Sequence, residues 1–154
     1  MFLDRNEISK QLDIKDPFLM IDEIRIDISL NKAKSLKLLN KKEWFFLSHM
    51  TKYPVMPATL QMEGMLQTLV LLIYNVPENK SYRSFIVDAK TKFHSKVFSQ
   101  SFINYHAELI HNRRGIFKGL VVGKYHDEKI CEGEFTYASP DLMHLPSEKN
   151  KKIN

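Results

Sequence analysis

Two residues, His49 and Glu63, are of types that carry out general acid–base chemistry, and they flank Pro57 in the sequence. An imidazole can take or give a proton near neutral pH, and a carboxyl kept neutral by apolar surroundings can donate one. Pro57 and the apolar run from Ala58 to Val76 predict a helix that begins between the two residues. Its first N–H groups and partial positive charge can polarise a carbonyl, such as that of a thioester. A base, an acid and a carbonyl-polarising group are the parts needed to remove water from a 3-hydroxyacyl compound.

Each of these residues also has a simpler structural interpretation. A histidine in a loop is often structural or solvated, and Glu63 can face solvent or pair with a lysine. However, the helix from Ala58 to about Asn75 is apolar around most of its circumference and is expected to be buried on most sides. A carboxyl there is costly unless it is paired, hydrogen-bonded or neutral. The sequence has no metal-ligand cluster, GxSxG elbow, P-loop or dinucleotide fingerprint, so we expect no metal site.

The remaining elements follow from periodicity and turn residues. Residues 6–12 are expected to form a short helix capped by Asp4 or Asn6. Alternating isoleucines predict a half-buried strand over 22–28, and a second strand follows over 33–39, with Lys32, Lys34 and Lys37 exposed. The aromatic cluster over 43–47 is expected to pack onto the core and fix the loop before His49, the alternative being a ligand-binding aromatic box. Four further strands are expected over 82–92, 101–111, 116–125 and 130–138, with a hairpin turn at 112–115.

This order of elements predicts an α+β fold in which a long central helix is wrapped by a curved antiparallel β-sheet. The chain of 154 residues fits one domain, which we expect to span residues 1–140. Residues 141–154 are expected to be a polar, flexible C-terminal tail.

Composition excludes several classes of protein. The net charge is +5, but Lys and Arg are spread along the chain without a dense basic block, so we expect no nucleic-acid partner. The single cysteine, Cys131, excludes a disulfide framework and is expected to be a buried or half-buried strand residue. The N-terminus lacks a signal-peptide pattern, and the longest apolar run, Leu69 to Tyr74, is far short of the ~20 residues of a membrane span. A cytoplasmic protein is therefore expected.

The segment around His49 and Glu63 resembles the signature of FabZ-type 3-hydroxyacyl-ACP dehydratases, where ACP is acyl carrier protein. That signature is G-H-F-P-G-x-P-x-x-P-G followed by a helix with E-x-x-x-Q, and here it reads Ser48 to Ala58, then Glu63 and Gln67. Three strand segments are similar to those of the family, at residues 16–22, 87–93 and 113–118. The departures from the signature include Ser48, Met50, Thr51 and Ala58.

The resemblance implies a hotdog fold and a homodimer, in many relatives a trimer of dimers, with His49 of one subunit facing Glu63 of the other. It implies that His49 abstracts the proton α to the thioester carbonyl and that Glu63 helps the 3-hydroxyl leave. The backbone N–H of Ala58 would polarise the thioester oxygen, and the carbonyl of Val55 would orient the imidazole. No cofactor is implied.

The implied substrate is a 3-hydroxyacyl chain carried by ACP, which is dehydrated to the trans-2-enoyl form in fatty-acid or related biosynthesis. Two alternatives stay open: a hotdog acyl-thioesterase in which Glu63 activates water, and an acyl-ACP-binding homologue with weak or no activity. Several basic residues are candidates for docking acidic ACP, although solvated strand ends explain them equally well; these are Lys90, Lys92, Lys96, Arg113, Arg114 and Lys118. No motif accounts for His94, His106, His111, His126 or His144.

Overall fold

The computed structural model describes residues 1–79 and 83–142, and these residues form one seven-stranded sheet with three α-helices. In chain order the elements are β1 (Phe2–Asp4), α1 (Arg5–Leu12), β2 (Glu23–Asp27), β3 (Lys32–Leu39), α2 (Trp44–Ser48), α3 (Ala58–Asn75), β4 (Phe85–Phe93), β5 (Ser101–Arg113), β6 (Ile116–Tyr125), β7 (Glu128–Ala138) and the 3-10 turn η1 (Pro140–Leu142). None of the described helices is long and apolar enough to cross a membrane.

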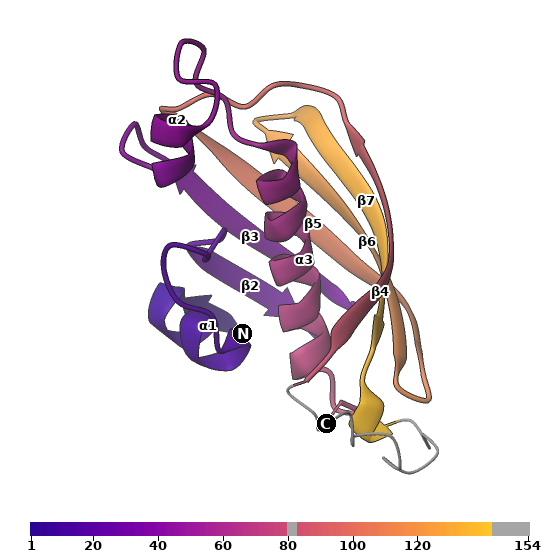
Figure 1. The fold of residues 1–154 in the computed structure, drawn as a ribbon. Coiled ribbons are helices and arrows are strands. Elements are labelled where there is room, and N and C mark those ends of the chain that lie inside the picture. The colour runs from indigo at the N-terminus through magenta and orange to yellow at the C-terminus, as the bar shows by residue number, and fades with distance from the viewer. Residues whose placement is uncertain (80–82, 143–154) are drawn as a thin grey trace, which may run out of the picture.

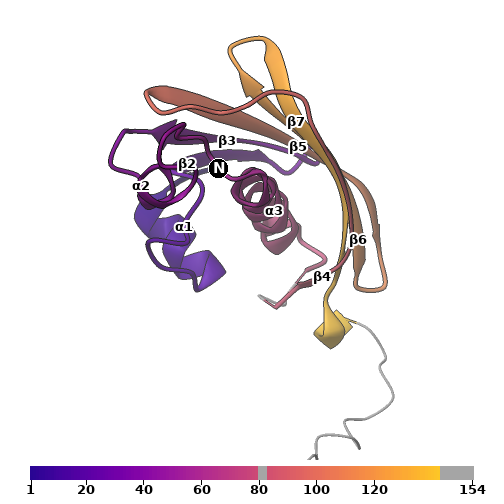
Figure 2. The same cartoon turned by 45° about the horizontal axis from the view of Figure 1, so that its top comes forward.

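The sheet is antiparallel throughout, with strand order β1-β2-β3-β5-β6-β7-β4. It curves around α3, which lies along its concave face, while α1 and α2 lie near the β2–β3 end (Figures 1 and 2). The prediction of an α+β fold with a long helix wrapped by a curved antiparallel sheet is confirmed. The crossover from α3 places β4 at the edge of the sheet, next to β7 instead of β5.

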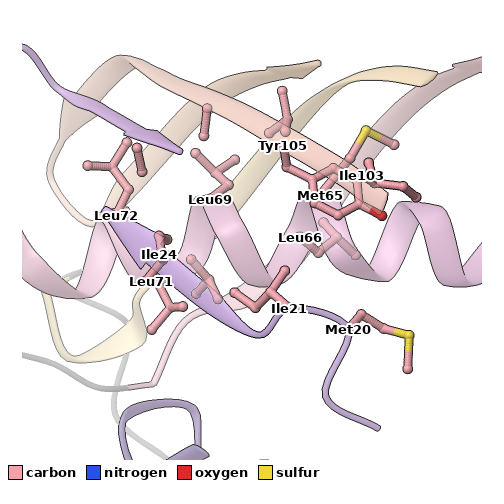
Figure 3. Close-up of a cluster of buried hydrophobic side chains, with 14 of the residues drawn as sticks. Met20, Ile21, Ile24, Met65, Leu66, Leu69, Leu71, Leu72, Ile103 and Tyr105 are labelled. Atoms are coloured by element: carbon pink, nitrogen blue, oxygen red, sulfur yellow. The ribbon is translucent and has the colours of Figure 1, made fainter. Parts of the chain in front are cut away.

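Helix α3 is buried because apolar side chains cover most of its circumference. Met65, Leu69, Leu71 and Leu72 are fully buried, and Figure 3 shows them gathered with residues of the neighbouring strands, such as Tyr105. The predicted bounds are confirmed, except that Pro57 is the residue before the helix and not part of its first turn. Its fixed φ of −54° still suits this position.

Gly64 lets α3 approach the sheet closely at the position after Glu63. A Cβ at residue 64 would lie 2.5 Å from the hydroxyl of Tyr105, which is itself fully buried on β5. The glycine and the tyrosine are therefore matched in size, and the glycine sets the distance between the Glu63 segment of α3 and the centre of the sheet.

The prediction that Lys37 is exposed was wrong. Strand alternation places Lys37 on the same face as Ala33, Ser35 and Leu39, all of which are buried, and only 3% of its side chain is accessible. Its ammonium donates to Glu43, which makes burial of the charge tolerable. Lys32 and Lys34 are exposed, as predicted.

Other differences are local. The strand β1 was not predicted, because three residues carry too little periodicity to be recognised. The aromatic segment is the short helix α2, in which Phe45 and Phe46 are buried as expected. Asp4 caps α1 in a capping box with Glu7. Cys131 is buried, and Gly115 supplies the positive φ of the β5–β6 turn.

Residues 143–154, which include His144 and most of the predicted tail, lie outside the described part of the chain. The domain bounds of 1–140 and the tail over 141–154 therefore stay predictions.

Candidate active site

His49 lies at the C-terminal end of α2, where its backbone N–H donates to the carbonyl of Phe45 at 2.9 Å. Its side chain is half-buried, and Nδ1 lies 3.0 Å from the carbonyl oxygen of Val55. This is the contact that the resemblance implies for Val55. Because a carbonyl can only accept, Nδ1 must carry a proton. In the neutral imidazole, Nε2 is then the nitrogen that is available to take a proton.

The loop from His49 leads directly into the start of α3. Met56 donates its N–H to the carbonyl of Val97 at 2.8 Å, which ties this loop to the β4–β5 connection. Pro57 precedes the helix and no side chain of the described residues caps it. Ala58, the first helical residue, is exposed, and its N–H belongs to the first turn, where intrahelical acceptors are lacking. The positive end of the α3 dipole therefore begins three residues after Val55, whose carbonyl His49 contacts.

Glu63 is held by Gln67, one turn further along α3. The side-chain amide of Gln67 donates from Nε2 to Glu63 Oε1 and to the carbonyl of Phe18, each at 2.9 Å. Its Oε1 accepts the N–H of Met20, also at 2.9 Å. These partners fix the orientation of the amide. If its N and O were exchanged, Nε2 would face the N–H of Met20, and Oε1 would face two other acceptors, the carbonyl of Phe18 and Glu63 Oε1. One oxygen of Glu63 is thus occupied, and Oε2 is left to act on a substrate.

Sequence reasoning placed Gln67 in the signature but gave it no role. The spacing did carry a signal, because residues four apart lie on the same face of a helix and can contact each other.

We expect replacement of Gln67 by leucine to destabilise the fold by about 2 kcal/mol, because the buried N–H of Met20 and the carbonyl of Phe18 lose their partner. Urea unfolding measures this change. Gln61→Leu is the matched control on the same helix, because Gln61 Oε1 is buried without a partner among the described residues, so its loss should be neutral or stabilising. Equal destabilisation by the two substitutions would contradict this assignment.

Glu63 opens into a pocket of about 620 Å³ between α3 and the β4 edge. The pocket is lined mainly by apolar side chains, including Leu66, Val70, Phe85 and Ile86. Burial raises the pKa of Glu63, while the hydrogen bond from Gln67 opposes this rise. The direction favours the protonated form that a general acid requires. His49 is not one of the described residues that line this pocket.

The six basic residues proposed for docking fall into separate groups. Lys90 and Lys118 flank Glu134 on the outer face of the sheet, and Lys118 forms an ion pair with it. Arg113 and Arg114 lie in the β5–β6 hairpin. Lys92 lies opposite Glu132, two residues from Lys90 on β4, and the two lysines line the same surface pocket. Lys96 lies near the His49 loop, with its ammonium 5.3 Å from the ring centre of Tyr53. Of the six basic residues, Lys96 is thus the one that lies beside the His49 loop of the same chain.

Three of the histidines without a motif have surroundings that the structure describes. His94 contacts Glu132 at 3.1 Å, and His126 packs against the rings of Phe102 and Tyr125. The pKa of His106 is lowered by partial burial and by two nearby lysines. No group of three or more metal-ligating side chains is found within residues 1–79 and 83–142.

An α+β domain in which a long helix lies inside a curved antiparallel sheet is a hotdog fold. Solved structures agree at the level of the fold. The dehydratase heterocomplex ApeI:P from Xenorhabdus doucetiae has a TM-score of 0.70 at 9% identity, covering 86% of this chain and 90% of that one. The HP0420 homologue from Helicobacter felis has a TM-score of 0.66 at 17% identity, covering 92% of each.

Sequence comparison defines the family. The model of the FabA-like domain matches residues 14–134, so the chain belongs to the FabA-like family. The 3-hydroxyacyl-[acyl-carrier-protein] dehydratase FabZ of Oceanobacillus iheyensis is 30% identical over 137 residues, which are 88% of this chain and 98% of the relative. The FabZ of Bacillus subtilis is 29% identical over 137 residues, covering 88% and 97%.

Proposed function

We infer that this protein is a 3-hydroxyacyl-ACP dehydratase, a lyase that forms the 2-enoyl thioester in fatty-acid biosynthesis. The observation that carries this function is the pair of oriented groups on either side of the α3 start. His49 has its Nε2 available as a base, and Glu63 has a raised pKa and one free oxygen. The match to FabZ relatives over nearly their whole length supports the same reaction and an acyl-ACP substrate.

In this mechanism His49 Nε2 removes the proton from the carbon next to the thioester carbonyl. The electron pair of that C–H bond forms the C=C bond, and the C–O bond to the 3-hydroxyl breaks. Glu63 donates the proton from Oε2, so that the hydroxyl leaves as water. The N–H of Ala58 stabilises negative charge that develops on the thioester oxygen. Afterwards the imidazolium loses its proton and the carboxylate regains one, which restores the starting state. No step requires a cofactor.

We propose that two copies of the chain complete each site, as a homodimer that can associate further into a trimer of dimers. Support comes from β4, an edge strand whose apolar side chains are open to solvent in the single chain. Phe85 and Val87 are 59% and 60% exposed, although isolated edge strands are usually shielded or charged. Phe85 also lines the Glu63 pocket, so a partner covering β4 would reach this pocket. The partner would bring its own His49 loop opposite Glu63.

Replacement of Val87 by lysine should therefore yield monomers with at least 100-fold lower kcat/KM, since a buried unpaired charge opposes association and each site loses half of its groups. Sedimentation analysis and steady-state kinetics measure the two effects. Leu30→Lys is the control, because Leu30 is 61% exposed in the β2–β3 turn, away from β4. A fully active Val87→Lys monomer would contradict a shared site.

The function is tested by mixing the purified protein with 3-hydroxyacyl-ACP and following all products by mass spectrometry. A dehydratase yields the 2-enoyl-ACP and no free thiol. Release of free ACP thiol would instead identify an acyl-thioesterase, and tight binding without product would identify a non-catalytic acyl-ACP-binding protein. Either result would overturn the proposed reaction.

We propose Lys96 as the first of the six basic residues to contact ACP, because it adjoins the His49 loop. Lys90, Lys92, Arg113, Arg114 and Lys118 would contribute to docking where the partner subunit brings them to the same entrance. A cytoplasmic location, as expected from the sequence, is part of this proposal.

A further inference from the structure

Lys37 carries a buried charge that the proposed chemistry does not use. It lies on the concave side of β3, and only 3% of its side chain is accessible. Its ammonium donates to Glu43 Oε1 at 2.9 Å and lies 3.9 Å from Asp22 Oδ1. A buried lysine is rare, and it persists where its partners hold it in place.

Glu43 is the residue immediately before α2. In this position the side chain of Asp, Asn, Ser or Thr commonly caps the helix, whereas the carboxylate of Glu43 makes no capping bond. It points to Lys37 instead. The start of α2 is therefore tied to β3 by a charge-assisted hydrogen bond between Glu43 and Lys37.

Lys37 on β3 is in turn linked to other charged groups through Asp22. Asp22 accepts the N–H of Leu38 at 2.7 Å and forms an ion pair with Arg5 of α1, which also pairs with Asp16. Lys37 thus belongs to a network that joins α1, β3 and the segment before β2. Such a network is stiffer than an isolated surface pair, since Arg5, Asp22 and Lys37 each have two charged partners.

The other end of α2 is His49. The helix has five residues, which is too short to be stable alone, so its direction depends on its contacts with the rest of the fold. Those contacts are the buried Phe45 and Phe46, the bond from Trp44 Nε1 to the carbonyl of Pro17 at 3.2 Å, and the Glu43–Lys37 bond. A shift at the start of α2 is passed along its rigid backbone to His49.

We propose that Lys37 is a positioning residue for His49: through Glu43 it fixes α2, and α2 fixes the imidazole. The catalytic part of this inference rests on the proposed dehydratase function. A reacting group misplaced by about 1 Å can lose roughly 100-fold in rate. The loss should appear in kcat, because substrate contacts are unchanged.

The test compares Lys37→Met with the double variant Lys37→Met/Glu43→Gln. The single variant leaves the Glu43 carboxylate without its ammonium and is expected to lose stability. The double variant removes both charges, so it should melt close to the wild type, yet it still lacks the bond from β3 to α2. Lys34→Met is the matched control, since Lys34 lies on the exposed face of the same strand.

We expect the double variant to have a kcat about 10- to 100-fold lower, with KM within about twofold of the wild type. The amide of His49 should exchange its hydrogen at least about tenfold faster than in the wild type. Wild-type kcat and wild-type exchange in the double variant would overturn the inference, as would an equal loss in Lys34→Met. If the wild-type protein fails to dehydrate 3-hydroxyacyl-ACP, the proposed function fails, and the exchange rate of the His49 amide still decides whether Lys37 positions α2.

Discussion

Replacement of His49 by alanine is expected to lower kcat/KM for 3-hydroxyacyl-ACP by about 1,000-fold, because the reaction loses its base. The change should fall mainly on kcat, since the imidazole acts on the reacting carbon and contributes little to binding the acyl chain. Steady-state kinetics with 2-enoyl-ACP as the measured product test this.

The control for this variant is His106→Ala, which removes an exposed imidazole on the outer face of β5 and should leave turnover unchanged. Circular dichroism establishes that both variants are folded. Because the imidazole is half-buried and has one hydrogen bond to a backbone carbonyl, its loss should cost little stability. Normal turnover by a folded His49→Ala protein would exclude His49 as the base.

Replacement of Glu63 by glutamine is expected to reduce kcat/KM by a similar factor, about 1,000-fold, while leaving the fold intact. Glutamine has nearly the same shape, and its carbonyl oxygen can still accept from Gln67. It cannot give a proton to the leaving hydroxyl. The measurement is again product formation, with Gln61→Leu on the same helix as a control that should retain activity.

The pH dependence of stability provides an independent check on Glu63. Burial raises the pKa of its carboxyl in the folded state above the value in the unfolded chain. As pH rises above the pKa of the unfolded chain, the unfolded state loses this proton first, so the wild type becomes progressively less stable. The loss of stability reaches its full size once pH exceeds the folded pKa, and it persists at higher pH. The glutamine variant lacks this titration. It should therefore gain stability relative to the wild type between about pH 4 and pH 8.

Urea unfolding at both pH values measures that difference. An unchanged or opposite difference would mean that Glu63 is not kept neutral by burial. The same raised pKa predicts that kcat/KM of the wild type falls on the alkaline side, where Glu63 loses the proton that it must donate.

Much of this architecture can be read from local sequence. The bounds of α3 follow from Pro57 and the apolar run after it, and β2 follows from its alternating isoleucines, because helix and strand periods are properties of consecutive residues. The β5–β6 turn follows from Gly115 for the same reason. The family resemblance similarly rests on a contiguous segment, in which His49, Pro57 and Glu63 keep their spacing.

The tertiary structure decided what depends on partners distant in the chain. In the sequence Lys37 has the pattern of a solvated lysine, but in the structure β3 directs it inward towards Glu43. The role of Gln67 depends on Phe18 and Met20, from which it is separated in the sequence by the strands β2 and β3. Free energies of burial and hydrogen bonding are set by such contacts, and local periodicity does not encode them. The sequence by itself therefore predicts which residues perform the chemistry, whereas the fold determined which residues hold them.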